Sequence, residues 1–312
     1  MAKPGMEFGQ LLPRRPPVRG RLQTHWHSRA IRAGAIMTNR NEESPDRHLS
    51  EDRERPRKLA NPIIVTTSWD DGHPCDLRLA EMLSERGLGG TFYIPFAGPG
   101  GKPTLQPGDL RPLSRAGFEI GAHTMSHRTL AGMQCDQLWR EVFRSKEALE
   151  QILGQDAVMF CYPRGRYDQG VVRAVREAGY LGARTTQMLA HSLQFNPFEM
   201  PTTLQAYPHP PLDYLKNLGR RKDLAGLCRY LSQWSRYGSW LELGKRLFDR
   251  VLREGGVWHL YGHSWEIDEL GLWSQLRELL DYVSNRTGVF YPNNGVVVQL
   301  LQEQFSRVPE VV

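Results

Sequence analysis

The chain has 312 residues, more than an average domain needs but a common length for a single α/β barrel. Its formal net charge of +6 is located in residues 1–36, which hold seven Lys or Arg and one Glu, so the remaining chain is formally neutral. No basic patch on the folded part therefore needs explaining, and no nucleic-acid partner is predicted. No run of 18 apolar residues predicts a membrane span.

The N-terminal segment 1–60 is predicted to be disordered or extended. Residues 1–36 are rich in Pro and Arg without an apolar period, and residues 38–60 are dense in charges of both signs. Met37 is an alternative start of the chain, and an organelle-targeting peptide is a second interpretation of the first residues. The cysteines are scattered without a C-x-x-C pair, which predicts reduced thiols in a cytoplasmic protein.

The folded domain is predicted over residues 61–312 and begins with an apolar, β-branched strand that runs into Asp70 and Asp71. Strand and helix patterns then alternate along the chain. Further strands are expected at 91–94, 118–122, 158–162, 183–186, 200–203, 257–261 and 289–291. Amphipathic helices are expected between them, with loops over 98–108 and 262–266 and a helical insertion over about 211–254. The pattern predicts a parallel α/β barrel wrapped by helices.

Two pairs of polar residues are expected at the carboxyl ends of strands. Adjacent carboxylates such as Asp70 and Asp71 repel each other, so a cation nearby would favour their ionised forms. His123 and His127 are four residues apart where a strand turns toward a helix, and two imidazoles in that position can face one metal ion. In a barrel these strand ends are neighbours in space.

These motifs resemble the polysaccharide deacetylase family, the NodB-homology carbohydrate esterases (family 4). The resemblance covers about residues 61–291 and includes the motifs in the same order as in the family. The motifs are Ser-Trp-Asp70-Asp71-Gly, His123-Thr-x-x-His127, Phe160-x-Tyr-Pro163-x-Gly165 and His263 after a strand. The resemblance implies a distorted (β/α)7-type barrel, one divalent metal ion and hydrolysis of N- or O-acetyl groups on sugars.

The resemblance also implies roles for individual residues. Asp71, His123 and His127 correspond to the metal ligands, Asp70 to the general base and His263 to the general acid. The backbone N–H of Arg164 corresponds to the oxyanion donor of the third motif, and substrate contacts are expected from Tyr162, Arg166 and Trp265. The implied metal is Zn²⁺, with Co²⁺, Ni²⁺ and Fe²⁺ as alternatives.

One position departs from the family pattern. The fullest third motif has an Arg two residues before its Pro, which holds the base, and here Cys161 occupies that position. Arg164, Arg166 or Arg184 could supply a guanidinium instead. His259 is an alternative to His263 as the acid, and we favour His263 because Gly262 marks the strand end. Trp265 could stack on a sugar ring, or it could pack within its loop.

We therefore expect a cytoplasmic, metal-dependent deacetylase that acts on an N-acetylated sugar or glycoconjugate precursor. Two alternatives stay open. One is an amidase for a non-sugar C–N amide substrate, and the other is a catalytically inactive, carbohydrate-binding member of the family. The sequence does not define the sugar, the metal species or the oligomeric state.

Overall fold

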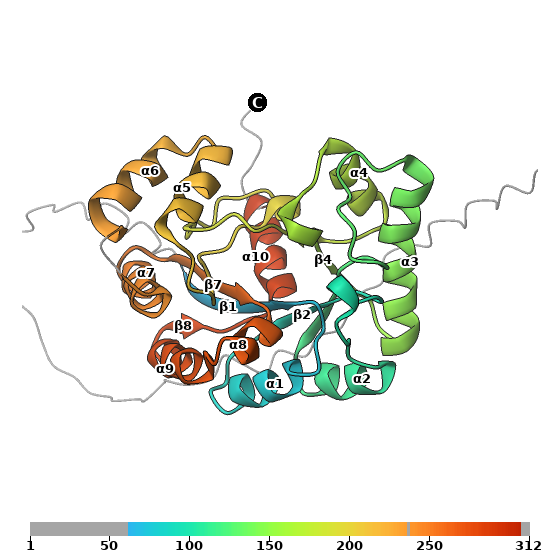
Figure 1. Cartoon of the computed structure of the whole chain (residues 1–312), viewed down its shortest axis with the longest axis horizontal. Helices are drawn as coiled ribbons and strands as arrows, with labels where there is room; N and C mark the ends of the chain where they lie inside the picture. Colours follow the sequence, from blue (N-terminus) through green and yellow to red (C-terminus); the bar gives the residue numbers. More distant parts are fainter. Residues whose placement is uncertain (1–61, 236–237, 307–312) are drawn as a thin grey trace, which may run out of the picture. The chain divides into compact units, whose positions relative to one another are not determined.

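The computed structural model of the chain describes residues 62–235 and 238–306 (Figure 1). The predicted N-terminal segment 1–60 and the alternative start at Met37 lie outside the described residues. Among the described residues, no helix combines the length and the apolar character that crossing a bilayer requires.

The described residues form an eight-stranded sheet in which every pairing is parallel. The strand order is β5-β4-β3-β2-β1-β7-β6, and β8 pairs with the start of β1. The strands are β1 (Ile63–Asp70), β2 (Thr91–Ile94), β3 (Glu119–Ala122), β4 (Met159–Cys161), β5 (Gly182–Arg184), β6 (Leu204–Gln205), β7 (Gly256–Gly262) and β8 (Val289–Phe290). All carboxyl ends therefore lie at one edge.

The sheet curls, and the stretch before β6 contacts β5 at one end of the strand order and β7 near the other end. Met200 forms a parallel bridge with Arg184 of β5, and the Thr203 N–H donates to the His259 carbonyl of β7. The result is a distorted barrel with β1 and β7 side by side in its wall (Figure 1). The predicted fold class is confirmed.

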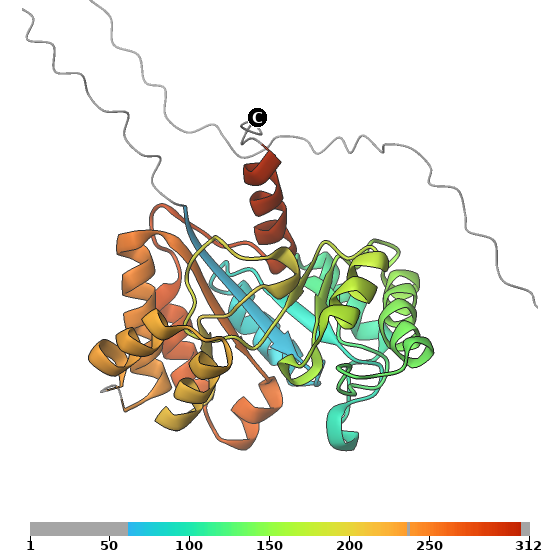
Figure 2. The same cartoon turned by 90° about the horizontal axis from the view of Figure 1, so that it is seen from above.

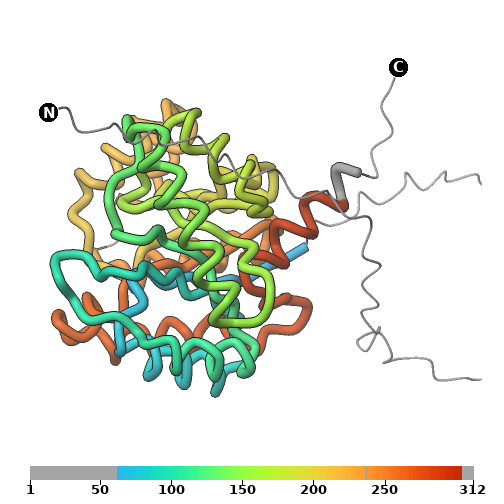
Figure 3. The backbone as a smooth tube through the Cα atoms, turned by 90° about the vertical axis from the view of Figure 1, so that its right-hand side faces the viewer, coloured from blue at the N-terminus to red at the C-terminus, as the bar shows by residue number. Residues whose placement is uncertain are grey.

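Helices surround these strands (Figure 1). They are α1 (Asp76–Ser84), α2 (Pro107–Arg115), α3 (Cys135–Leu153), α4 (Gln169–Glu177), α5 (Pro211–Arg220), α6 (Leu224–Arg229), α7 (Trp240–Glu254), α8 (Ser264–Glu269), α9 (Trp273–Val283) and α10 (Asn294–Ser306). Short 3-10 turns cover Pro99–Gly101, Pro163–Gly165 and Pro197–Glu199, and a π-turn covers Tyr230–Trp234. Helix α3 packs against both α2 and α4 on one side of the barrel (Figure 3).

The end of the barrel opposite to the strand carboxyl ends is covered by α10 (Figure 2). Val297 and Val298 in its first turns are fully buried and pack in one cluster with Ile64 and Met159 from the strands. The Asn294 side chain donates from Nδ2 to the Tyr93 hydroxyl at 3.0 Å. These contacts anchor the first turns of α10 at the end of the barrel away from the strand carboxyl ends.

Two helices differ from the sequence expectation. Helix α2 begins at Pro107, inside the stretch expected to be a loop, because Pro suits the first turn and Gln106 and Asp109 form a capping box. Helix α8 occupies residues 264–269, where a loop was expected. The range 211–254 holds α5, α6 and α7, but its status as an insertion, like the domain boundaries, stays a prediction.

Candidate active site

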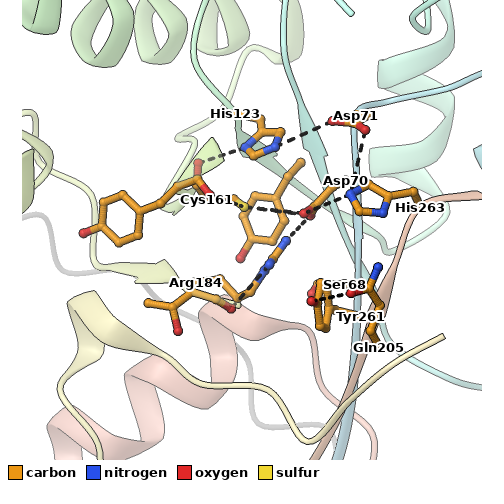
Figure 4. Close-up of polar contacts among 12 residues, drawn as sticks. Ser68, Asp70, Asp71, His123, Cys161, Arg184, Gln205, Tyr261 and His263 are labelled. Carbon is orange, nitrogen blue, oxygen red and sulfur yellow. Dashed lines mark hydrogen bonds and ion pairs between the residues drawn. The ribbon is translucent and has the colours of Figure 1, made fainter. Parts of the chain in front are cut away.

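Side chains from distant parts of the sequence meet at the carboxyl edge of the sheet (Figure 4). Asp70 is the last residue of β1 and Asp71 follows it; His123 follows β3 and His263 follows β7. Asp70, Asp71 and His123 are almost completely buried. The parallel topology places these residues together because each one lies at or just after the end of a strand.

Asp71, His123 and His127 converge in the way that metal ligands do. Oδ1 of Asp71 lies 3.2 Å from Nε2 of His127 and 3.7 Å from Nε2 of His123. One donor atom from each residue lies within 4.8 Å of the others. Oδ1 of Asp71 is buried and accepts no hydrogen bond, although a buried carboxylate oxygen is normally satisfied. Two neutral imidazoles and one carboxylate fit a divalent ion such as zinc and leave coordination positions open.

Neighbouring groups hold these three side chains in place. The Nδ1 atom of His123 lies 2.9 Å from the Cys161 carbonyl, which turns Nε2 toward Asp71. The Trp265 indole N–H donates to Oδ2 of Asp71 at 2.9 Å. Burial lowers the pKa of His123 to about 4, so its ring is neutral, as a ligand must be. Oδ1 of Asp71 is thus left free while the surrounding bonds fix the geometry.

The backbone around the site is strained. Asp71, Thr124, His127 and Arg164 all have left-handed backbone angles, with φ of 76°, 72°, 53° and 59°. Non-glycine residues adopt this conformation at a cost, which tertiary contacts must offset. A local hydrogen bond from the His127 N–H to Oγ1 of Thr124 at 2.9 Å joins two of these residues.

Asp70 forms an ion pair with Arg184, whose Nη2 donates to Oδ1. Arg184 is completely buried, and its guanidinium lies between the rings of Tyr93 and Tyr261 at 5.4 and 4.8 Å from their centroids. Burial alone would raise the pKa of Asp70, but the charge of Arg184, with smaller contributions from nearby histidines, lowers it to about 2. Asp70 is therefore ionised at neutral pH.

Cys161 and Arg184 are register partners on β4 and β5. The Cys161 thiol lies 3.8 Å from both carboxylate oxygens of Asp70, so a side chain at position 161 also faces the base. An Arg at position 161, as in the family motif, would lie beside the Asp70 carboxylate. Here the guanidinium of Arg184, on the neighbouring strand, contacts that carboxylate instead. Of the three arginines left open by the sequence, Arg184 is the one that contacts Asp70.

His263 lies on the other side of the acid pair. Its Nε2 is 3.9 Å from Oδ2 of Asp70 and 3.8 Å from Oδ2 of Asp71, and its Nδ1 is 2.7 Å from Oε2 of Glu266. Burial alone would lower the pKa of His263, but the hydrogen bond to Glu266 and the charges of both aspartates raise it to about 9. The ring is thus protonated at neutral pH.

The other candidate residues occupy different surroundings. His259 is buried in the wall of the barrel, with Ser68 Oγ at 2.8 Å and the Pro201 carbonyl at 3.0 Å from its ring nitrogens. Tyr162 is buried and donates from its hydroxyl to the Phe198 carbonyl at 3.0 Å. Neither residue lines the cavity at the site.

Three further candidates lie nearer the surface. Arg166 is exposed and does not line the cavity at the site. Lys102 Nζ lies 4.0 Å from the ring centroid of Trp265, so it covers part of this ring. Arg164 lines the cavity. The substrate contacts expected of these residues, including stacking of Trp265 on a sugar, stay predictions.

Comparisons with known proteins agree with this geometry. The family model described as polysaccharide deacetylase matches residues 58–183. These residues belong to the polysaccharide deacetylase family. The resemblance inferred from the motifs is thereby confirmed.

Individual relatives show how far this deacetylase resemblance extends. The chain is 26% identical over 140 residues to "Putative polysaccharide deacetylase YxkH" of Bacillus subtilis, covering 45% of this chain and 48% of that protein. It is 30% identical over 121 residues to the uncharacterized protein SCO4760 of Streptomyces coelicolor, covering 38% of this chain and 46% of that protein. The chain thus spans about half the length of these curated relatives.

A solved structure supports the barrel fold of this chain. The crystal structure of a "putative polysaccharide deacetylase from Mycobacterium smegmatis" is similar with a TM-score of 0.54 and 17% identity. The similarity covers 80% of this chain and 93% of that one. At this identity the match establishes the shared barrel only.

The candidate site includes residues that the sequence did not single out. Glu266 contacts His263, and the Gln205 amide donates to Glu266 Oε2 at 3.1 Å. The Tyr261 hydroxyl in turn donates to Gln205 Oε1 at 2.6 Å. The spacing of His263 and Glu266, three residues apart in a helical turn, is a signal that could have identified this partner.

A cavity of about 350 Å³ extends from the candidate site to α5. Its lining residues are Asp70, His123, His127, Arg164, Thr186, Met188, Gln205, His209, Asp213, Lys216, Asn217, Arg220, Tyr261 and His263. The contribution of α5 could not be inferred from sequence, because it depends on how the helices after β6 fold back over the barrel.

Proposed function

We propose that the protein is a metal-dependent hydrolase that removes an acetyl group from an N-acetylated sugar or glycoconjugate precursor. The observation that carries this proposal is the convergence of Asp71, His123 and His127 around the unsatisfied Oδ1 of Asp71. Asp70 and His263 flank that point, and a cavity opens onto it. Membership of residues 58–183 in the deacetylase family supports the same reaction class.

Asp71, His123 and His127 would hold the metal ion. When bound, a divalent ion at these ligands supplies Lewis-acid polarisation of the acetyl carbonyl and promotes the ionisation of water. Zinc suits the donor set best, while Co²⁺, Ni²⁺ and Fe²⁺ also accept imidazole and carboxylate ligands.

Asp70 is the proposed general base. Its carboxylate is ionised and buried, and the pairing with Arg184 fixes one oxygen while Oδ2 faces His263. A buried charge without a partner would favour protonation, which would remove the base. Arg184 therefore acts as a positioning residue that keeps Asp70 ionised and oriented.

His263 is the proposed general acid. A protonated imidazole on the opposite side of the carboxylates can give its proton to the departing amine nitrogen, and Glu266 stabilises that protonated form. The proposed oxyanion donor is the backbone N–H of Arg164, whose left-handed conformation belongs to the tight Pro163–Gly165 turn at the cavity.

Two alternative functions can be distinguished from this proposal by experiment. An amidase for a non-sugar C–N amide would use the same ligands, and an inactive carbohydrate-binding protein would keep the barrel without turnover. The ion pair of Asp70 with Arg184 favours turnover, because it provides the guanidinium contact that Cys161 cannot. A cytoplasmic location is proposed on the sequence alone, and the oligomeric state is left open.

The test is metal analysis of the purified full chain together with acetate release from a panel of N-acetyl sugars and simple acetamides. We expect about one divalent ion per chain and acetate release from at least one sugar. Metal with turnover of acetamides alone would favour the amidase. Absence of both metal binding and turnover would favour the inactive protein.

A further inference from the structure

Helix α5 forms a positively charged wall of the cavity. Lys216 and Arg220, one turn apart on this helix, both line the cavity. Arg164 lines the same cavity from the turn after β4. Three cations thus border a space that is also lined by His123 and His127, two of the candidate metal ligands.

The wall is held firmly against the barrel. Asn217 Oδ1 accepts from the Met188 N–H at 2.9 Å, and its Nδ2 donates to the Thr186 carbonyl at 2.8 Å. Tyr214 and Leu218 on the same helix are buried at 4% and 1% exposure. These contacts fix α5, so Lys216 and Arg220 are presented from a rigid element and not from a mobile loop.

The positive charge of this wall is only partly compensated. Asp213 lies 3.6 Å from Lys216 Nζ and 3.6 Å from His209 Nδ1. Within residues 62–235 and 238–306, Arg164 and Arg220 form no ion pair and no hydrogen bond through their guanidinium groups. The other carboxylate that lines the cavity, Asp70, is paired with Arg184. An anion entering the cavity would therefore meet uncompensated guanidinium groups.

We propose that Arg164, Lys216 and Arg220 bind a phosphate group carried by the substrate. The substrate class would then be a phosphorylated acetamido sugar, with its acetamido group at Asp71, His123 and His127 and its phosphate against α5. Arg binds phosphate oxygens through two parallel hydrogen bonds and Lys binds them as a point charge. A cavity of about 350 Å³ is the size of a small-ligand pocket. The acetamido part of this assignment rests on the proposed function; the phosphate part does not.

Binding can be measured without the reaction by using sugars that lack an acetyl group. Titration calorimetry would compare glucose, glucose 1-phosphate and UDP-glucose, with the full chain both metal-loaded and chelator-treated. The chelator-treated sample is needed because phosphate can also bind a metal ion directly. We expect glucose 1-phosphate or UDP-glucose to bind at least about tenfold more tightly than glucose in both samples, as expected for charge-assisted hydrogen bonds. Comparison of these two ligands tells a phosphomonoester from a nucleotide-linked sugar.

The variants identify the wall as the binding surface. Lys216→Gln with Arg220→Gln should weaken binding of the phosphorylated sugar by about tenfold or more and leave glucose binding unchanged. Arg140→Gln with Arg253→Gln is the matched control, because both arginines are exposed on α3 and α7 and do not line the cavity. This control should bind like the wild type.

Two results would overturn the inference: no preference for the phosphorylated sugar over glucose, or equal affinity in the α5 variant and the wild type. Selective phosphate binding without acetate release from any substrate would contradict the proposed function and support the phosphate site. Acetate release from neutral sugars without any preference for phosphorylated ones would contradict the phosphate site alone.

Discussion

Arg184, the last residue of β5, donates a hydrogen bond to Asp70, the last residue of β1, across 114 positions of sequence. Both side chains are buried, and the pair lies beside the candidate metal ligands. Figure 4 shows the guanidinium approaching Asp70 from the side opposite to Asp71 and His123. The pair therefore contributes both to the stability of the barrel and to the ionisation of Asp70, the proposed base.

Replacing Arg184 should affect stability and activity together. Arg184→Gln leaves Asp70 as an unpaired buried carboxylate, so unfolding in urea should show a loss of about 3 kcal/mol or more. The pKa of Asp70 should rise and acetate release should fall. The double variant Asp70→Asn with Arg184→Gln should recover part of the stability, because no charge is then left unpaired. Equal stability of Arg184→Gln and the wild type would contradict the account.

The sequence predicted the strands and the site motifs better than it predicted the partners of the site residues. The apolar run into Asp70 and the order of the motifs were sufficient for β1, for the barrel and for bringing together Asp71, His123 and His127 as candidate ligands. The choice of Arg184 over Arg164 or Arg166 depends on the register of β4 and β5, which pairs Cys161 with Arg184. Sequence periodicity does not define that register.

The helices that differed from expectation have local causes. Helix α8 is only six residues long, which is too short to show a clear helical period in the sequence. Glu266 lies in its first turn. Helix α2 contains Pro112 and begins with Pro107 and Gly108, residues that usually indicate a loop. Helix α2 has a capping box and buries Leu110 and Leu113, and helix α8 buries Ile267, so packing contributes to both helices.

The pH dependence of activity should report His263. Its pKa is raised to about 9, so the protonated acid is present at neutral pH and activity should fall as pH rises through that value. Glu266→Gln removes the hydrogen-bonded carboxylate, so the pKa of His263 should fall and the alkaline limb of kcat should move to lower pH. An unchanged alkaline limb in this variant would exclude Glu266 as the partner of the acid.

Substitutions of the two histidines near the end of β7 should separate their roles. His263→Ala should keep metal and lose about 10² to 10⁴ in kcat, the range for a general acid. His259→Gln should mainly lower the melting temperature, because His259 is buried between Ser68 and Pro201. A larger loss of kcat in a folded His259→Gln variant than in His263→Ala would reverse the assignment.

Glu119 should make stability depend on pH away from the site. Burial raises its pKa from 4.5 to about 7, although its oxygen accepts from Thr91 Oγ1 at 2.6 Å and from the Gly295 N–H at 3.0 Å. The folded state therefore binds this proton more tightly than the unfolded state. The contribution to the free energy of unfolding is greatest below the unfolded pKa and is lost as pH rises to about 7.

Glu119→Gln should remove this dependence while its amide oxygen accepts the same hydrogen bonds. We expect the variant to be up to about 3 kcal/mol more stable than the wild type in mildly alkaline buffer and to match it in buffer below the unfolded pKa of 4.5. Melting curves at both pH values provide the measurement. A variant that is less stable than the wild type in alkaline buffer would show that Glu119 is ionised and favourably paired in the folded protein.

The most direct test is the metal content of the purified wild type and of Asp71→Asn, His123→Ala, His127→Ala and Asp70→Asn, measured by mass spectrometry after exposure to zinc. The account predicts about one zinc ion per chain in the wild type and in Asp70→Asn, and strongly reduced occupancy in the three ligand variants. Folded ligand variants that retain full occupancy would contradict it.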